Sequence, residues 1–352
     1  MVRAFEIGGR PVGEGAPCFF IAEAGVNHNG ELSKARDLID GAMAASVDAV
    51  KFQTFSAARI ALADAPKAAY QLDAEKKHES QLQMLRRLEL SRQDHKRLIA
   101  HCRDRRMMFL SSPFDQESAD LLEELDVPAF KIPSGELTNT AFLAHVARKG
   151  RAMIVSTGMA SMTEVETAVR TIADNGDPPL ALLHCVSAYP ASPADCNLKA
   201  MDTLRAAFGV PVGWSDHTKG VEVTLAAVAR GADIVEKHFT LSRALPGPDH
   251  QASMEIPEMV ILLAALRAVE AAIGDGIKAP RPSEREVASV ARKSLVSTQD
   301  IKAGETLTVE RVGARRPGTG IPADRLDDYL GRRLKVDVPE GALLDAAMFE
   351  EG

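Results

Sequence analysis

The sequence predicts an α/β fold in which a (β/α)8 barrel is followed by a small β-rich domain. The first observation is a set of eight short apolar runs, rich in β-branched residues, that each end in polar or small residues. The runs span residues 18–27, 48–55, 107–114, 129–136, 152–159, 180–190, 211–218 and 233–240. Amphipathic segments with helical spacing lie between them, and the composition changes near residue 280. Eight alternations of strand and helix are the signature of such a barrel, whose usual size is about 250 residues.

The connecting segments support this interpretation. Two of the amphipathic segments begin with capping boxes, Ser91 with Asp94 and Ser161 with Glu164. The interval between the second and third strands is longer than the others and contains AYQLDAEKKHESQ, which we interpret as an insertion on a strand-to-helix loop. Loops of this kind carry the active sites of such barrels. The hairpin-like start AFEIGGRPVG is expected to close the opposite face.

The domain boundaries follow from the same patterns. We assign residues 1–282 to the barrel with its N-terminal hairpin, residues 283–290 to a linker, and residues 291–352 to the small domain. The last part consists of short strands broken by Gly and Pro turns. A module of about 60 residues buries little apolar surface, so we expect it to lean on another surface.

Composition excludes several classes of protein. The 352 residues are 45% hydrophobic and 26% charged, which is ordinary for a soluble globular protein. Aromatic residues make up only 5%, and 42 Lys and Arg against 49 Asp and Glu give a net charge of −7, so nucleic acid is not an expected partner. No apolar run resembles a signal peptide or a membrane span, and we expect a cytoplasmic protein. The four scattered cysteines are expected to be buried thiols.

Polar residues recur at the ends of the predicted strands. Residues i and i+2 of a strand share a face, so polar pairs at this spacing point together into the barrel mouth. These residues are Glu23, Lys51 with Gln53, Ser134 with Glu136, Ser187 with Tyr189, Ser215 with His217, and Glu236 with His238. One such pair could equally be a hydrogen-bonded core pair or a solvated rim. Their recurrence on most strands predicts a site, because burying so many polar groups without a function is costly.

Two kinds of ligand are indicated by these residues. His217 and His238 end neighbouring strands about 4.8 Å apart, so both imidazoles can reach one divalent ion of the Mn²⁺ or Mg²⁺ class, with open positions for water and substrate. Lys51 and Lys131 lie on strands and need an anionic partner, unless their stems are buried and their ammonium groups reach water. Nearby serines and glycine turns add hydrogen-bond donors, which predicts a pocket for phosphate and carboxylate groups.

The ordered motifs resemble the sialic acid synthase family over essentially the whole chain. They are IAEAGVNHNG, KFQTF, KIPSGE, STGM, HCVSAYP, GWSDHT, EKHFT and GPDHQAS, with KSLVSTQDIKAGETLT and RRPGTGI in the last domain. The resemblance implies a TIM barrel followed by an antifreeze-like domain of the β-clip type. It also implies metal-dependent condensation of phosphoenolpyruvate with an N-acylated mannosamine-type sugar, giving a nonulosonic acid and phosphate. The dimer implied is domain-swapped, with the C-terminal domain of one chain over the barrel mouth of the other.

The resemblance also implies roles for individual residues. Phosphoenolpyruvate would be held by Lys51, Ser112, Lys131, Ser134, Ser156, Ser187 and Ser215. His217 and His238 would bind the metal, for which Mn²⁺ is expected, with Mg²⁺ or Co²⁺ as alternatives. Glu23, Gln53, Tyr189 and Asp249 would face the sugar, with Arg316 reaching in from the partner chain. Ser112 and Ser187 stand where threonine and asparagine are frequent in the family.

Chemical reasoning adds catalytic roles to this set. Glu136 is our candidate to accept the proton of the attacking water, while Lys51 and Lys131 stabilise the departing phosphate. Glu23 is placed in the same catalytic group. We expect N-acetylneuraminate synthase activity. The alternatives are a legionaminic acid synthase that uses 2,4-diacetamido-2,4,6-trideoxymannose, a pseudaminic acid synthase, a noncatalytic sugar-binding homologue, and another phosphoenolpyruvate-dependent aldol-type synthase on the same barrel.

Overall fold

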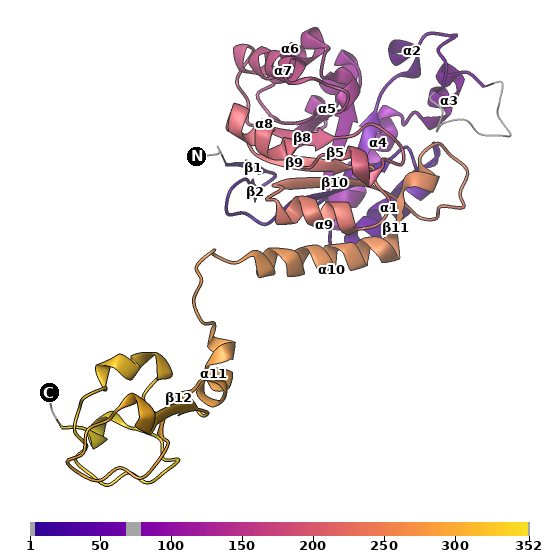
Figure 1. Ribbon diagram of the computed structural model, residues 1–352. Coiled ribbons are helices and arrows are strands. Elements are labelled where there is room, and N and C mark those ends of the chain that lie inside the picture. Colours follow the sequence, from indigo (N-terminus) through magenta and orange to yellow (C-terminus); the bar gives the residue numbers. More distant parts are fainter. Residues whose placement is uncertain (1–3, 68–78, 351–352) are drawn as a thin grey trace. The chain divides into compact units, whose positions relative to one another are not determined.

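The computed structural model describes residues 4–67 and 79–350, and it divides the chain between Gly274 and Asp275 into two compact units (Figure 1). The division lies before the expected end of the barrel domain at residue 282. Residues 283–290, which we interpreted as a linker, are mostly helical and belong to the second unit, in η6 (Pro282–Glu284) and α11 (Arg285–Ala291). The helix forms because Pro282 occupies its first turn and the following residues are good helix formers.

The first unit is the predicted barrel of eight parallel strands. The strands are β3 (Phe19–Gly25), β4 (Ala49–Thr54), β5 (Met108–Pro113), β6 (Ala129–Ile132), β7 (Ala152–Ser156), β8 (Leu180–Cys185), β9 (Val212–Asp216) and β10 (Ile234–Thr240). They pair in the order β5-β4-β3-β10-β9-β8-β7-β6, and the two ends of this path lie close together, so the barrel is nearly closed. A short strand, β11 (Met254–Glu255), pairs in parallel with the end of β10.

Helices follow the strands and cover the outside of the barrel. They are α1 (Leu32–Ala44), α2 (Ala57–Ile60), α3 (Gln81–Leu88), α4 (Arg92–Asp104), α5 (Gln116–Glu124), α6 (Thr140–Ala147), α7 (Met162–Asp174), α8 (Ala200–Phe208), α9 (Glu222–Ala229) and α10 (Ile256–Ile273). Both predicted capping boxes are present, at the starts of α4 and α7. The insertion between β4 and β5 contributes α2 and α3, and part of the polar segment predicted there lies outside the described residues.

The half of the barrel interior at the amino ends of the strands, which we call the lower half, is apolar. Its buried cluster contains the first inward-facing residues of the strands, among them Phe19, Ala49, Ala152 and Ile234. The hairpin of β1 (Phe5–Ile7) and β2 (Arg10–Val12) packs into the same cluster, which confirms that the N-terminal hairpin closes this end. A larger apolar cluster fills the space between the strands and the outer helices. All four cysteines are buried and free, as expected.

The upper half of the interior, at the carboxyl ends of the strands, is polar on the same strand faces. In β3 the inward series runs from Phe19 through Ile21 to Glu23, and in β10 it runs from Ile234 to Glu236 and His238. The change from apolar to polar occurs at the carboxyl ends of the strands, which is the face where such barrels hold their active sites. The apolar layer therefore supports a polar layer above it.

The second unit has a core of its own. It contains an antiparallel pair of β12 (Ser294–Ser297) and β13 (Val312–Arg315), with η7 (Val309–Arg311) between them and the short 3₁₀ segments η8 (Ala323–Asp328) and η9 (Ala346–Met348) after them. The buried residues of this core are Leu295, Ile301, Leu307, Ile321, Leu334, Val338, Leu344 and Phe349. The predicted β-rich domain is therefore confirmed as a separate compact body.

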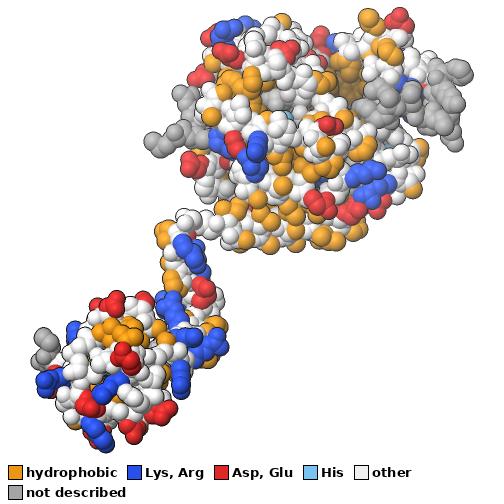
Figure 2. All heavy atoms as spheres, in the orientation of Figure 1, with side chains coloured by type: hydrophobic (Ala, Val, Ile, Leu, Met, Phe, Trp, Pro, Cys, Tyr) orange, Lys and Arg blue, Asp and Glu red, His pale blue; other side chains and the backbone are white. Residues whose placement is uncertain are grey.

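The surface of the first unit carries an apolar strip along α10. Figure 2 shows hydrophobic side chains gathered over this helix, and Val260, Ile261 and Ile273 are exposed there. Within the described part of the chain, no helix has both the length and the apolar character needed to cross a membrane.

Candidate active site

Four buried charged side chains form a connected chain at the carboxyl ends of the strands. Lys51 Nζ lies 2.7 Å from Glu23 Oε2 on the neighbouring strand β3 and 3.7 Å from Glu236 Oε1 on β10. Glu236 Oε1 also lies 3.5 Å from Lys131 Nζ on β6, across the barrel. Each of the four side chains is at most 5% exposed. One carboxylate thus serves as counter-ion for both lysines.

Hydroxyl groups fix the orientation of the two ammonium groups. Lys51 Nζ donates to Ser112 Oγ at 2.9 Å, and Lys131 Nζ donates to Ser156 Oγ at 2.8 Å. Both serines belong to strands adjacent to their lysines, β5 and β7, so the pairs follow from the strand order. Gln53 Nε2 donates to Glu23 Oε1 at 3.1 Å. The site therefore presents two aimed cations with hydroxyls beside them.

Burial and mutual charge alter the pKa values of these groups. Burial and the neighbouring Glu236 carboxylate together raise the pKa of Glu23 to about 7, although Lys51 opposes both effects. Burial also lowers the pKa of Lys131, and only part of this loss is recovered from Glu236. The pKa of Lys51 is raised, because Glu23 and Glu236 together outweigh the effect of burial. Among these four charged groups, Glu23 is therefore the one whose charge changes near neutral pH.

The two predicted metal ligands face each other on the other side of the site. The rings of His217 and His238 have centroids 5.4 Å apart, and the Tyr189 ring lies 4.1 Å from His217 and 5.6 Å from His238. His217 Nδ1 donates to the carbonyl of Val186 at 2.8 Å, which leaves Nε2 as the nitrogen with a lone pair in the neutral ring. Burial holds the pKa of His238 well below its ordinary value, so this imidazole is neutral at pH 7.

The donor set fits an open metal site. His238 Nδ1 is buried without a hydrogen-bond partner and lies 3.9 Å from Asp249 Oδ2. Burial raises the pKa of Asp249 to about 6. Across the described residues, no group of three or more His, Cys, Asp or Glu side chains is close enough to hold a metal. The two imidazoles suit an ion whose remaining ligands are water and substrate oxygens.

A third group of predicted residues meets at Gly158. Ser134 Oγ accepts a hydrogen bond from the Gly158 N–H at 3.0 Å, and a Cβ atom at Gly158 would lie 2.3 Å from Ser187 Oγ. A larger residue at this position would displace at least one of the two serine hydroxyls. Cys185 Sγ lies beside them, 4.0 Å from Ser187 Oγ. Ser215 is buried on β9 and pairs in register with Glu236 and Cys185.

One predicted site residue, Glu136, lies differently from the expectation. We expected Glu136 to share a strand face with Ser134, but β6 ends at Ile132 and residues 134–136 form the 3₁₀ turn η3 (Ser134–Glu136). Glu136 is half-buried there and accepts from Asn139 Nδ2 at 2.8 Å. Pro133 begins the turn, since it cannot donate to a strand ladder. Arg316 is exposed in the second unit, where its Nε donates to the Ala291 carbonyl at 3.0 Å.

The central role of Glu236 was missed. The sequence placed it on the face of His238 but assigned it no function. A charge count could have found it, because Lys51 and Lys131 on the strands each need a buried anion, and Glu23 alone can balance only one of them.

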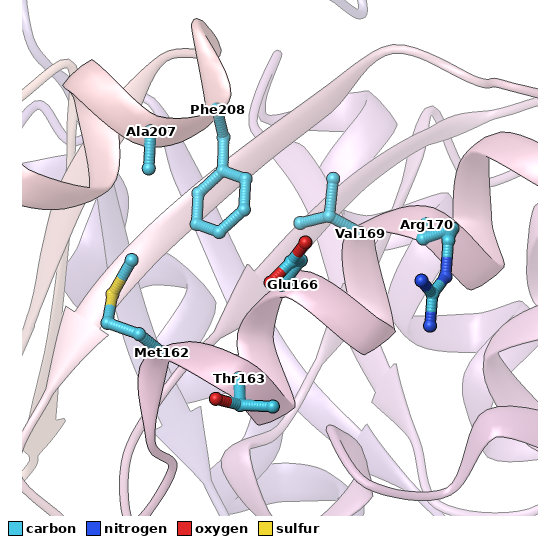
Figure 3. Close-up of a pocket in the computed structure, with 7 residues that line it drawn as sticks. All are labelled: Met162, Thr163, Glu166, Val169, Arg170, Ala207 and Phe208. Carbon is cyan, nitrogen blue, oxygen red and sulfur yellow. The ribbon is translucent and has the colours of Figure 1, made fainter.

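A separate pocket of about 430 Å³ lies between α7 and α8 on the outside of the barrel (Figure 3). It is lined by Met162, Thr163, Glu166, Val169, Arg170, Ala207 and Phe208. None of the predicted site residues lines it, so the candidate site is the cluster at the strand ends.

Comparisons with known proteins agree with this geometry. A model of the NeuB family matches residues 38–278, and a model of the SAF domain matches residues 292–350. N,N'-diacetyllegionaminic acid synthase of Campylobacter jejuni is 46% identical over 326 residues, which cover 92% of this chain and 98% of that protein. N-acetylneuraminate-9-phosphate synthase of Mus musculus is 35% identical over 94% of this chain and 92% of its own.

A solved structure gives the same result. The crystal structure of N-acetylneuraminic acid (sialic acid) synthetase from Leptospira borgpetersenii, in complex with citrate, is similar with a TM-score of 0.72 and 34% identity, covering 82% of this chain and 95% of that one. The chain therefore belongs to the NeuB family, the family of the sialic acid synthases, with its antifreeze-like SAF domain at the C-terminus.

Proposed function

We propose that this enzyme condenses phosphoenolpyruvate with an N-acylated mannosamine-type sugar, to give a nonulosonic acid and phosphate with cleavage of the phosphoenolpyruvate C–O bond. The observation that carries the proposal is the pair of buried lysines with their serines, at the same carboxyl ends of the barrel strands as two neighbouring imidazoles. An anion with phosphate and carboxylate groups fits the lysines and serines. A substrate carbonyl that requires activation fits the two imidazoles.

Phosphoenolpyruvate would lie between the lysines. Lys51 and Lys131 supply the charge, and their hydrogen-bonded partners Ser112 and Ser156 supply hydroxyls. Ser134 and Ser187 at Gly158, with Ser215 on β9, complete the set. As phosphate leaves, the lysines balance its growing negative charge in a site from which water is largely excluded.

The sugar would bind on the histidine side. Glu23, Gln53, Tyr189 and Asp249 border this region, and they would orient the open-chain aldehyde toward the enol carbon. A divalent ion held by His217 and His238 would polarise that aldehyde as a Lewis acid. We propose Mn²⁺ for this ion, with Mg²⁺ or Co²⁺ as alternatives.

Proton transfer falls to a carboxylate outside the strands. After carbon–carbon bond formation, water adds to the carbon that bears the phosphate, and Glu136 would accept its proton, an effect of about 10² to 10⁴ in rate. The turn η3 places Glu136 at the start of α6, where its side chain is only half-buried. Its distance from the lysines would then shorten when substrate closes the site, as apo geometries of catalytic groups often require.

The active unit would be a domain-swapped homodimer in the cytoplasm. Arg316 is exposed and belongs to the second unit, so a partner chain can deliver it to the sugar. The exposed apolar residues of α10 provide a surface for association. The small size of the C-terminal core is consistent with a need for support from another chain.

Sequence identity favours the legionaminic alternative over our main expectation of N-acetylneuraminate. The relative that makes N,N'-diacetyllegionaminic acid shares 46% identity, whereas the N-acetylneuraminate-9-phosphate synthase shares 35%. We therefore propose 2,4-diacetamido-2,4,6-trideoxymannose as the sugar. The reason is that residues in contact with the sugar's substituents differ between enzymes that use different sugars, so higher identity favours the same substrate.

The test compares two sugars under one set of conditions. Purified enzyme with Mn²⁺ and phosphoenolpyruvate labelled with ¹⁸O at the bridging oxygen is mixed with 2,4-diacetamido-2,4,6-trideoxymannose or with N-acetylmannosamine. We expect faster phosphate release with the diacetamido sugar, and we expect the label to leave with the phosphate. The matched control His217→Ala should fold but lose at least about 100-fold in rate.

Each other outcome is informative. A higher kcat/KM for N-acetylmannosamine would restore the neuraminate assignment. An unlabelled phosphate product would contradict C–O cleavage. No phosphate release with either sugar would reject the proposed function and favour a noncatalytic sugar-binding protein.

A further inference from the structure

The segment between β10 and β11 returns to the strand from which it left. Residues 241–253 leave β10 after Thr240, and β11 then pairs with the end of β10 through Phe239 with Met254. Arg243 closes the base of this loop, since its Nε donates to the Ser253 carbonyl at 3.0 Å and its main-chain N–H donates to Glu255 Oε1 at 2.9 Å. The loop carries Asp249, whose carboxylate faces His238.

A buried histidine ties the tip of the loop to the first strand-to-helix connection. His250 is fully buried, with Nδ1 2.6 Å from Thr240 Oγ1 and Nε2 3.2 Å from Asn29 Oδ1. Asn29 Nδ2 donates to the Pro246 carbonyl at 2.8 Å, which orients the amide so that its oxygen faces His250. His250 Nε2 therefore carries the proton that it donates to Asn29.

The main chain approaches Asn29 closely at Gly247. A Cβ atom there would lie 2.6 Å from Asn29 Oδ1 and 2.7 Å from the His250 ring, and the residue has φ of 150°. Only glycine satisfies both conditions. The sequence GPDH therefore places the loop tip against the NHN segment.

A second tether holds the carbonyl of Asp249 itself. Ser253 Oγ donates to the Asp249 carbonyl at 2.7 Å and accepts from Asn27 Nδ2 at 2.9 Å. Asn27 Nδ2 also donates to the carbonyl of Phe239 at 2.8 Å, so one buried amide joins the connection after β3, the strand β10 and the loop. The loop around Asp249 is thus attached at two points, Asn29 and Asn27, to the connection between β3 and α1.

We propose that Asn27, Asn29, His250 and Ser253 form a latch that positions the Asp249 carboxylate for the sugar. The proposal rests on the proposed function, in which Asp249 faces the sugar. The four residues act through Asp249 and do not touch the reacting atoms, so they are positioning residues. Loss of the latch should weaken sugar binding and leave phosphoenolpyruvate binding intact, because the lysines lie on other strands.

The experiment uses His250→Asn and its matched control His95→Asn in the full-length enzyme. His95 is also fully buried and also bonded at both ring nitrogens, to Thr54 Oγ1 at 2.8 Å and to the Ser91 carbonyl at 2.9 Å, but it lies on α4. Asparagine keeps a polar group near the Nδ1 position and is too short to reach the Nε2 partner. His250→Gln reaches that partner, and Ser253→Ala removes the second tether alone.

We expect His250→Asn and Ser253→Ala to raise KM for the sugar about tenfold and to change KM for phosphoenolpyruvate by less than about twofold, the size expected from one lost buried hydrogen bond. His250→Gln should recover most of the sugar KM. Amide hydrogen exchange in residues 241–253 should speed up in His250→Asn and stay at the wild-type rate in His95→Asn.

The latch is overturned if exchange in residues 241–253 stays at the wild-type rate in His250→Asn, or if both KM values rise together. It is equally overturned if His95→Asn has the same effect as His250→Asn. Faster exchange in an enzyme that turns over neither sugar would reject the proposed function but keep the latch as a device that orders Asp249. The two failures are therefore distinguishable.

Discussion

At the scale of single residues, the site is a balance of two cations and two carboxylates. When Glu23 is ionised, its charge and that of Glu236 cancel the charges of Lys51 and Lys131. When Glu23 is protonated, the four groups carry one net positive charge. Because burial raises the pKa of Glu23 to about 7, this change occurs near neutral pH. Anion binding and proton uptake are therefore coupled.

This coupling predicts the pH dependence of anion affinity. A bound anion raises the pKa of Glu23 above its value of about 7 in the free enzyme, so binding takes up a proton and affinity falls as pH rises. Sulfate, whose charge is constant in this range, should bind about fivefold more weakly at pH 8 than at pH 6 by calorimetry. Glu23→Gln should flatten this dependence. If the sulfate affinity of Glu23→Gln fell with pH as steeply as that of the wild type, the proton would be taken up by another group.

At the scale of elements, strand β9 requires a glycine in the lower layer of the barrel. A Cβ atom at Gly213 would lie 2.1 Å from the Ile234 carbonyl oxygen on β10 and 2.7 Å from Leu183 on β8. The backbone of β10 cannot move away without breaking its pairing with β9. The residue therefore sets how closely the strands that carry His217 and His238 approach each other.

Gly213→Ala should consequently lower the free energy of unfolding by about 3 kcal/mol, measured by urea denaturation. The control is Gly135→Ala in η3, where a Cβ atom would meet nothing within 4 Å. The control should change stability by less than about 0.5 kcal/mol. Equal effects of the two substitutions would show that the close contact at Gly213 carries no strain.

The strands and helices were predictable because their signal is periodic and local. Eight apolar runs with helical segments between them sufficed for the barrel, and Ser91 and Ser161 marked two helix starts. Details that depend on tertiary contact were not predictable. The turn at Ser134 breaks a strand pattern that continues in sequence, and the sharing of Glu236 by both lysines depends on β6 and β4 facing each other across the barrel.

At the scale of the whole molecule, the chain contains two separate hydrophobic cores. The barrel clusters and the cluster around Leu295 and Leu334 share no residues, and the exposed segment 275–281 connects the two units. Each unit therefore has its own source of stability. The C-terminal core is the smaller and depends on few large side chains.

Leu295→Ala should consequently destabilise the second unit alone. Its side chain is 2% exposed, and such truncations cost about 2–5 kcal/mol. Amide hydrogen exchange should accelerate in β12 and β13 and keep its wild-type rates in β3 and β10. Leu266→Ala on α10 is the reciprocal control, since Leu266 is fully buried in the barrel. Loss of protection in both units from Leu295→Ala would mean that they unfold as one.

The layered interior of the barrel also bears on how the enzyme can change. Depth along each strand separates two kinds of position: the residues near the hairpin govern whether the chain folds, and those near the opposite rim govern what it binds. Side chains near the rim, and with them the substrate, can therefore change during evolution while the apolar layer near the hairpin stays the same.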